Sequence, residues 1–503
     1  MPIPKSIPEN PVSATTDSCS PQLGLDDPSL FIQAGIINGE HVTARETFDV
    51  DNPATGEIIG TCPDMDVDDT RRAIDVAHAA FQSFKSTPPL ERQAYLAKLH
   101  ALVLRHADDL ARLIVWENGK AWPDAVAEVA YAASYVSWFA GEAVRQNGEV
   151  LPSTAGHNFV IKQPVGVCAL LVPWNFPIGM IARKVAPALA TGCTAVVKVP
   201  AETPYTNLAF VELVHRAGVP AGVVNVVTTH AHLVDVGKEL TTNPKISKVS
   251  FTGSTRVGKI LAAQASTTLK KLSLELGGNA PLIVFEDADI PTAVAGTLAS
   301  KFRGSGQTCV CANRIYVHEA VYDEFAEALA SRVRQFKTGP GFADGVTHGP
   351  LIHKAAADKV QQHLDDAVAR GARVVAGGRR LGDTLLEPTV LVDVPADCLL
   401  TGEETFGPLA ALIRFRTEDE VVALANASEV GLAGYFFSND ADRIWRVAEQ
   451  LAVGMVGANT GVISSALVPF GGVKESGYGK EGGRDGTDEY LVKKLVVVGS
   501  RVG

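Results

Sequence analysis

The chain has 503 residues, a formal net charge of −11 at pH 7, 46% hydrophobic residues and 20% charged residues. This balance is that of an ordinary globular protein and excludes disorder over most of the chain. The acidic charge, without a basic stripe, argues against a nucleic-acid partner. The purest apolar run, 165–174, is far shorter than the roughly 20 residues of a membrane helix. The seven cysteines are too few and odd in number for a disulfide framework, so we expect free thiols.

The first segment, residues 1–30, is rich in Pro, Ser and Thr and carries one basic residue, Lys5. It has neither the apolar core of a secretory signal nor the Arg-rich pattern of a mitochondrial presequence, and residues 500–503 match no anchor or peroxisomal address. We therefore expect a flexible tail over 1–30 and a cytoplasmic location.

Beyond residue 30 the hydrophobic periodicity changes once. Apolar residues at 3.6-residue spacing predict helices over 68–85, 89–106 and 107–118. Strand-like runs then alternate with helices: strands 159–163, 166–172, 194–199, 223–227 and 249–252, and helices 181–191, 206–217 and 256–265. A second alternating block runs from 281 to about 473 and begins with helix 287–303, strand 314–318 and helix 319–336. Such alternation is typical of parallel sheets covered by helices, which predicts two α/β domains.

The segment 249–258 reads as a strand, a tight turn and the start of a helix. Gly253 permits the turn, and Ser254 or Thr255 can cap the helix, whose free N–H groups then suit a phosphate. The spacing is neither that of a P-loop nor G-x-G-x-x-G. By itself the segment leaves two alternatives, an ordinary structural turn and a dinucleotide pyrophosphate site.

Three residues are candidates for chemistry. Cys309 follows a small-residue stretch, and Arg303 could favour its thiolate; the alternative is a buried, inert cysteine. Glu275 is a single carboxylate between apolar residues, which is either a structural ion pair or a general base with a raised pKa. Asn175, held between Pro173 and Pro177, is either a turn residue or a donor to an oxyanion.

These segments occur in an order that identifies a family. From about residue 31 to 500 the chain resembles the aldehyde dehydrogenase superfamily. The motifs that carry the resemblance are Pro173-Trp174-Asn175-Phe176-Pro177, Phe251 to Thr255, Leu274 to Gly278, Gly306 to Cys309, Glu403 to Pro408 and Pro469 to Gly477. Each is a weak signal alone, but six in register are specific.

The resemblance implies an α/β fold of three parts. We expect a Rossmann-type cofactor domain from 31–145 and 165–277, an α/β catalytic domain over 278–476, and a small β bridging element from 146–164 and 485–503. The bridging element adds strands to a neighbouring subunit, so the resemblance implies a homodimer or homotetramer. We expect no nucleic-acid partner, no membrane partner and no metal.

The resemblance also assigns roles. Cys309 is expected to be the nucleophile, Glu275 the base that activates water, and Asn175 an oxyanion donor. The cofactor NADP or NAD is expected to contact Trp174, Lys198, Ala201, Glu202, Gly253, Ser254, Gly258, Leu276, Glu404 and Phe406, with Lys198 at the adenosine ribose and Glu404 and Phe406 at the nicotinamide side.

Within the family, the sequences around 301–303 and 309–314 are most similar to members that oxidise succinate semialdehyde. In those members the substrate carboxylate is held at the positions of Arg183, Arg303 and Ser464, and a guanidinium suits a carboxylate. The alternative for each arginine is a surface or interdomain salt bridge. Rival substrates are glutarate semialdehyde and aromatic or aliphatic aldehydes. The presence of Cys309, Glu275 and Asn175 together disfavours a non-catalytic, crystallin-like relative, and the presence of Glu275 disfavours an acyl-transferring one.

Two details depart from or extend the family pattern. NAD-preferring members have a Glu three residues after the ribose-binding Lys; here Ala201 occupies that position and Glu202 comes one residue later. Because neighbouring residues of an extended segment point to opposite faces, we expect NADP to be accepted, with NAD use as the alternative. Cys309 and Cys311 form a Cys-x-Cys pair that is either a redox switch or a nucleophile beside a packing residue.

Overall fold

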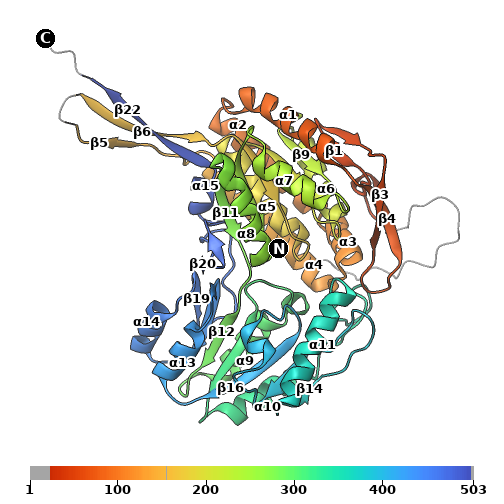
Figure 1. The fold of residues 1–503 in the computed structure, drawn as a ribbon, viewed down its shortest axis with the longest axis vertical. Helices are drawn as coiled ribbons and strands as arrows, with labels where there is room; N and C mark the ends of the chain where they lie inside the picture. Colours follow the sequence, from red (N-terminus) through yellow and green to blue (C-terminus); the bar gives the residue numbers. More distant parts are fainter. Residues whose placement is uncertain (1–22, 154–155, 500–503) are drawn as a thin grey trace.

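The computed structural model describes residues 23–153 and 156–499 and contains two helix-covered sheets and a projecting arm (Figure 1). The first sheet has the strand order β2 (Glu40–Val42), β1 (Gly35–Ile37), β9 (Val224–Val227), β8 (Thr194–Lys198), β7 (Val167–Leu171), β10 (Ile246–Thr252), β11 (Lys271–Glu275) and β21 (Gly477–Tyr478). Its five central strands, β9 to β11, are parallel. Their chain order, 3-2-1-4-5 across the sheet, reverses between β7 and β10, as in a doubly wound dinucleotide-binding fold.

Helices cover both faces of the first sheet. Along β7, Val167 and Ala169 face one core, and Cys168 and Leu170 face the other, as the alternation of a strand requires. One face carries α1 (Val67–Phe84), α7 (Leu233–Thr242) and α8 (Thr255–Ala265). The other carries α2 (Pro89–Arg105), α3 (Ala107–Asn118), α4 (Trp122–Glu142), α5 (Pro177–Thr191) and α6 (Pro204–Arg216).

The second sheet lies below the first in Figure 1 and has the order β14 (Arg373–Ala376), β15 (Thr389–Val392), β16 (Leu409–Phe415), β13 (Ala312–His318), β12 (Ala280–Val284), β18 (Ala433–Phe437) and β19 (Met455–Ala458). All its neighbouring strands are parallel except β14. The covering helices are α9 (Ile290–Lys301) and α10 (Tyr322–Val333) on one core, and α11 (Lys354–Ala369), α13 (Glu418–Asn426) and α14 (Ala441–Gln450) on the other.

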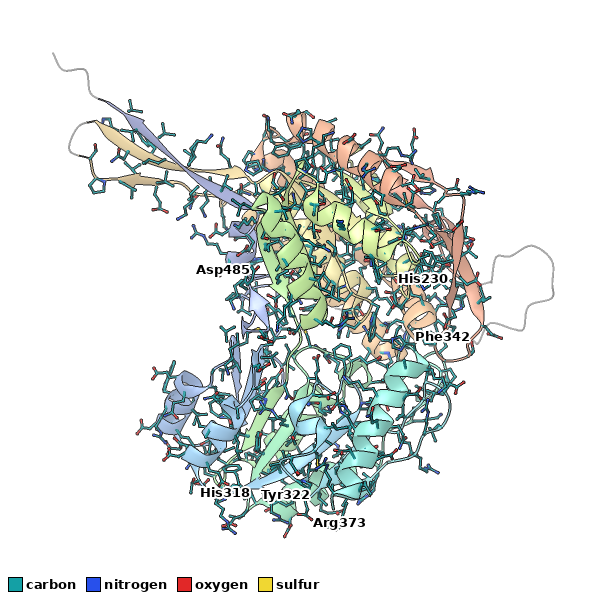
Figure 2. The ribbon with its side chains drawn as sticks, viewed as in Figure 1. His230, His318, Tyr322, Phe342, Arg373 and Asp485 are labelled. Atoms are coloured by element: carbon teal, nitrogen blue, oxygen red, sulfur yellow. The ribbon has the colours of Figure 1, made fainter. Side chains whose placement is uncertain are left out.

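The direction of the second sheet decides where a site can form. His318, the last residue of β13, lies with Tyr322 and Arg373 at the end of the molecule furthest from the first sheet (Figure 2). The carboxyl ends of these parallel strands therefore point outward, and their amino ends face the first sheet.

The arm consists of three antiparallel strands, β5 (Glu149–Leu151), β6 (His157–Pro164) and β22 (Leu491–Val498), with β6 in the middle. It projects away from both sheets in Figure 1. Several of its apolar side chains are exposed, among them Val150, Leu495 and Val497. The smaller elements are β3 (Thr47–Asp51) paired with β4 (Ile58–Pro63), β17 (Val430–Gly431) paired with β20 (Val473–Lys474), and the short helices α12 (Leu399–Gly402) and α15 (Asp485–Asp488).

The predicted α/β fold is confirmed, and the observed elements differ from the predicted ones mainly at their ends. Helix α5 begins at Pro177 rather than 181, since a proline suits the first turn of a helix. Helix α9 is shorter than the predicted 287–303 because Asp289 caps its start, and Gly304 takes a positive φ just beyond its end. Helix α4 was not predicted from the sequence. Residues 1–22 of the predicted tail lie outside the described part, but Leu23 and Leu30 are buried, so 23–30 belongs to the packed body.

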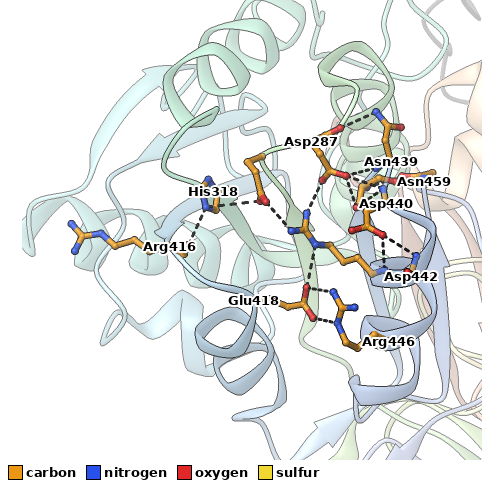
Figure 3. A network of polar contacts seen from close by, with 12 residues as sticks. Asp287, His318, Arg416, Glu418, Asn439, Asp440, Asp442, Arg446 and Asn459 are labelled. Atoms are coloured by element: carbon orange, nitrogen blue, oxygen red, sulfur yellow. Dashed lines mark hydrogen bonds and ion pairs between the residues drawn. The ribbon is translucent and has the colours of Figure 1, made fainter.

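A polar network fixes the edge of the second sheet (Figure 3). Arg443 forms ion pairs with Glu286, Asp287 and Glu418, and Asp287 also accepts backbone hydrogen bonds from Asn439 and Asp440. This network joins α13 and α14 to the end of β12 and is structural. Among the described residues no helix is long and apolar enough to cross a membrane, and no cluster of His, Cys, Asp and Glu is suited to a metal ion.

Candidate active site

The first half of the site follows the carboxyl ends of four neighbouring parallel strands. Register pairs Leu171 of β7 with Lys198 of β8 and with Phe251 of β10, and Thr252 with Glu275 of β11. The four strands are followed by predicted site residues: Trp174 and Asn175 after β7, Lys198 at the end of β8, Gly253 and Ser254 after β10, and Glu275 and Leu276 at the end of β11. The structure therefore brings these residues to one edge of the sheet.

The second half precedes the amino ends of neighbouring strands in the second sheet. Cys309 comes just before β13, and Glu404 and Phe406 come just before β16. The chain crosses from the first sheet to the second between Glu275 and the start of β12, and it passes close to the nucleophile loop. A Cβ on Gly278 would lie 2.5 Å from the Cys309 carbonyl oxygen, so this approach requires glycine.

Cys309 lies after a turn that bends sharply out of α9. Gly304, Ser305 and Gly306 all have positive φ values, which explains the glycine-rich sequence before the cysteine. The thiol is partly buried and faces a cavity. Burial raises the pKa of Cys309 to about 12, against the opposing effect of the Arg183 charge. The thiol is therefore protonated in the protein without ligands.

Asn175 is buried, and both its side-chain amide and its backbone carbonyl form hydrogen bonds. Its side-chain nitrogen donates to the backbone carbonyl of Gln307 at 2.9 Å, two residues before Cys309. Its own backbone carbonyl accepts a hydrogen bond from the Lys120 ammonium at 2.6 Å. An amide has two N–H donors, so one remains for a ligand oxygen near the thiol.

Glu275 is 2% exposed at the end of β11. Neither of its carboxylate oxygens has a hydrogen-bond partner in the described part of the chain. Burial, reinforced by the nearby negative charge of Glu481, raises the pKa of Glu275 well above its ordinary value. A buried carboxyl with free oxygens and a raised pKa has the properties of a general base.

A cavity of about 250 Å³ joins Cys309 to the predicted substrate residues Arg183, Arg303 and Ser464. The two arginines differ. Arg183 forms an ion pair with Glu481 at 2.7 Å and lies 4.1 Å over the Phe470 ring. Arg303 has no ion-pair partner among the described residues and lies 5.3 Å from the centre of the Phe176 ring. Arg303 is therefore the cation of this cavity that forms no ion pair, although the charge of the Asp124 carboxyl interacts with it, whereas Arg183 is in a buried salt bridge rather than the surface or interdomain one that the sequence left as an alternative.

The sequence analysis missed part of the cavity wall. The missed residues come from the end of α3 and from α4 and are Lys120, Asp124, Ala127, Glu128 and Tyr131. No motif marks them. The one available signal was the presence of charged residues in an otherwise apolar helix, because charged side chains that are buried need a partner.

The predicted cofactor residues of the first sheet lie at or just beyond the carboxyl ends of its strands, and their chemistry suits a nicotinamide dinucleotide. Lys198 has no ion-pair partner among the residues described, and burial lowers its pKa against the opposing charge of Glu202. Ser254 caps the start of α8, which is suited to a pyrophosphate. Gly258 allows Leu276 to pack closely, since a Cβ there would lie 2.4 Å from the leucine.

The residues that are expected at the nicotinamide are aromatic and acidic. Trp174 and Phe406 make an edge contact with ring centres 5.7 Å apart. Burial raises the pKa of Glu404 to about 7, and Glu404 accepts a hydrogen bond from the Gly278 backbone at 3.3 Å. Ala201 packs against the hydrophobic core that α2 to α6 form with the first sheet. Neither Ala201 nor Glu202 forms an ion pair with Lys198.

Cys311 lies apart from the cavity. Its thiol is buried and donates a hydrogen bond to the Lys301 carbonyl at 3.2 Å, and both Cys309 and Cys311 are free thiols. A bond between them requires Cys311 to leave that partner.

A thiol in a cavity between two sheets, beside a buried carboxyl and a dinucleotide-type strand edge, defines a cofactor-dependent oxidoreductase that acts through a cysteine. The model of the aldehyde dehydrogenase family matches residues 41–496. The chain belongs to the aldehyde dehydrogenase family.

Individual relatives agree. The chain is 56% identical to succinate-semialdehyde dehydrogenase [NADP(+)] 1 of Schizosaccharomyces pombe, over 94% of this chain and 97% of the relative. It is 52% identical to glutarate-semialdehyde dehydrogenase of Pseudomonas putida, over 94% and 99%. The crystal structure of succinate-semialdehyde dehydrogenase from Burkholderia pseudomallei matches with a TM-score of 0.93 at 51% identity, over 95% of this chain and 100% of that one.

Proposed function

We propose that this aldehyde dehydrogenase oxidises succinate semialdehyde to succinate. The observation that carries the proposal is the Arg303 guanidinium, which forms no ion pair among the described residues and lines the same cavity as Cys309. A cavity of about 250 Å³ is suited to a short aldehyde, and a guanidinium binds the two oxygens of a carboxylate. Two of the relatives described above carry this activity in their names.

The chemistry follows from the positions of three residues. The Cys309 thiol gives its proton to water, and its sulfur bonds to the aldehyde carbon; the resulting oxyanion accepts hydrogen bonds from the Asn175 amide and the Cys309 backbone N–H. A nicotinamide held by Glu404 and Phe406 would supply an acceptor for the hydride that leaves the aldehyde carbon, whose C–H bond breaks to give a thioester with Cys309. Glu275 then takes a proton from the water that attacks the thioester carbon, the C–S bond breaks, and the carboxylic acid leaves.

We propose NADP as the preferred cofactor, with NAD as the alternative. The Lys198 ammonium is available to a 2′-phosphate, and Ala201 brings no carboxylate to repel one. The S. pombe relative is named for NADP. The expected contacts at the two ends are Lys198 at the adenosine ribose and Glu404 at the nicotinamide side.

A second candidate substrate is glutarate semialdehyde, one carbon longer, which the P. putida relative carries in its name. Uncharged aliphatic or aromatic aldehydes would leave Arg303 desolvated without a partner, which disfavours them. A spectrophotometric panel tests the proposal: succinate semialdehyde, glutarate semialdehyde, butanal and benzaldehyde, each with NADP and with NAD. We expect the highest kcat/KM for succinate semialdehyde with NADP. Equal values for butanal would contradict the substrate, and strict NAD use would contradict the cofactor.

We further propose the domain organisation that the family resemblance implies: a cofactor domain from 31–145 and 165–277, a catalytic domain over 278–476, and a bridging element from 146–164 and 485–503. The exposed apolar residues of the arm support its pairing with a second copy in a homodimer or homotetramer. Light scattering of the protein with and without residues 491–503 tests the assembly. Cytoplasmic location stays a prediction.

A further inference from the structure

A buried lysine outside the predicted site forms a hydrogen bond with the turn that carries Asn175. Lys120 follows α3 and is 6% exposed. Its ammonium donates hydrogen bonds to the Asn175 backbone carbonyl at 2.6 Å and to the Glu128 carboxylate, and it lies 3.8 Å over the Phe176 ring. Two of its three N–H donors are thus used within the protein.

Glu128 holds the same turn from its other side. The carboxylate oxygen that does not face Lys120 accepts hydrogen bonds from the backbone N–H groups of Ile178 and Gly179, at 3.1 and 3.2 Å, in the first turn of α5. The ion pair therefore reaches across Asn175, from its own carbonyl to the helix that follows it. No other pair of charged side chains among the described residues contacts the backbone on both sides of Asn175.

The ion pair of Lys120 and Glu128 is expected to have a role other than stabilising the folded protein. Taking two charges out of water costs several kcal/mol, and apolar residues of the same size often stabilise a protein as well as a buried ion pair does. What a buried, hydrogen-bonded pair supplies is a fixed geometry. Here the group whose geometry it fixes is the Asn175 carbonyl, and the side-chain amide of the same residue lies beside the Cys309 loop.

We infer that Lys120, together with Glu128, is a positioning residue for the Asn175 amide, so that the free N–H of that amide points at the oxygen of the aldehyde during attack by Cys309. The inference rests on the proposed function, because it needs Asn175 to act on the reacting oxygen. Displacement of a positioned group by about 1 Å can reduce a rate on the order of 100-fold, so a loose turn has a measurable effect.

A double-mutant cycle tests this. The variants are Lys120→Met/Glu128→Gln, Asn175→Ala, and the two combined. Changing both charges avoids a buried unpaired carboxylate, and the side-chain carbonyl of the new glutamine still accepts from the first turn of α5. The readout is the pre-steady-state rate of reduced cofactor formation with succinate semialdehyde, with a thermal unfolding midpoint for each protein. Lys120→Gln/Glu128→Gln, which keeps an amide donor at position 120 without leaving a buried unpaired carboxylate, runs in parallel in the same cycle.

We expect the rate to fall about tenfold or more in the Lys120 variants and by about 10²–10³ in Asn175→Ala. The combined variants should be no slower than Asn175→Ala alone, because Lys120 acts through Asn175. A merely structural role would lower the rate by the same factor in both backgrounds, and that outcome overturns the inference, as does an unchanged rate in the Lys120 variants. An unchanged rate in Asn175→Ala overturns the role of Asn175 and with it the inference, whereas a wild type that forms no reduced cofactor from succinate semialdehyde overturns the proposed function itself.

Asn118→Ala is the matched control. Asn118 donates to the carbonyl of Trp174, the residue before Asn175, at 2.9 Å, so its loss loosens the same turn without releasing Asn175 itself. We expect a smaller fall in rate than in the Lys120 variants. An equal fall would show that general loosening of the turn accounts for the effect and would overturn the assignment to Lys120.

Discussion

Arg303→Met separates substrate recognition from stability. The change removes the guanidinium but keeps an unbranched side chain against the Phe176 ring. Since Arg303 has no ion-pair partner among the described residues, the loss affects the substrate carboxylate rather than an internal pair. Truncating one partner of a desolvated charge pair costs about 2–5 kcal/mol. At 1.36 kcal/mol per tenfold, kcat/KM for succinate semialdehyde should fall about 30- to 5,000-fold.

The assay compares succinate semialdehyde with butanal under the same conditions. Butanal has no carboxylate, so its kcat/KM should change little in Arg303→Met. Arg183→Met is the control, because it leaves Glu481 with Lys184 alone and removes a cation that lowers the pKa of Glu275. It should impair both substrates and lower the unfolding midpoint. Equal losses on the two substrates in Arg303→Met would refute the reasoning.

Three other changes have definite outcomes. Glu275→Gln should keep the first turnover but lower steady-state turnover by at least about 100-fold. The raised pKa of Glu275 leaves its carboxyl protonated at low pH, so thioester hydrolysis by the wild type should become faster as the pH rises. A thioester hydrolysis rate that does not depend on pH would contradict the role of Glu275 as a base. Ala201→Glu should change the ratio of kcat/KM with NAD to kcat/KM with NADP about tenfold or more in favour of NAD, because the new carboxylate repels the 2′-phosphate of NADP. An unchanged ratio would mean that the 2′-phosphate does not lie beside Lys198. After peroxide and then dithiothreitol, the wild type should recover activity and Cys311→Ala should not, if Cys311 traps oxidised Cys309; equal recovery would make Cys311 a packing residue.

Much of the fold and half of the site could be predicted because they follow from local rules. Alternating strands and helices predict a parallel sheet, and residues after parallel strands meet at one edge, which is where Asn175, Gly253 and Glu275 lie. The roles of Cys309 and the cofactor residues came from the family resemblance, not from the pattern.

The rest depends on contacts that no local pattern encodes. Lys120 and Glu128 are charged residues whose partners lie on a turn some fifty residues away. The ion pair of Arg183 with Glu481 joins residues about 300 positions apart in the sequence, so the sequence could not decide between substrate contact and salt bridge. The direction of the Cys311 thiol depends on the end of α9 behind it, which the Cys-x-Cys spacing does not determine.

The arrangement of the arm sets an order on synthesis and assembly. Its central strand β6 pairs at once with its neighbour β5, but its other edge is covered by β22, the last strand of the described chain. As the chain leaves the ribosome, this edge of β6 therefore stays open until nearly every other strand has been made, and open edges recruit other chains. A chain that stops before β22 would retain the strands of both sheets and the residues around Cys309, yet expose an unpaired edge. Completion of the arm thus converts a two-stranded hairpin, which is marginally stable by itself, into a three-stranded sheet.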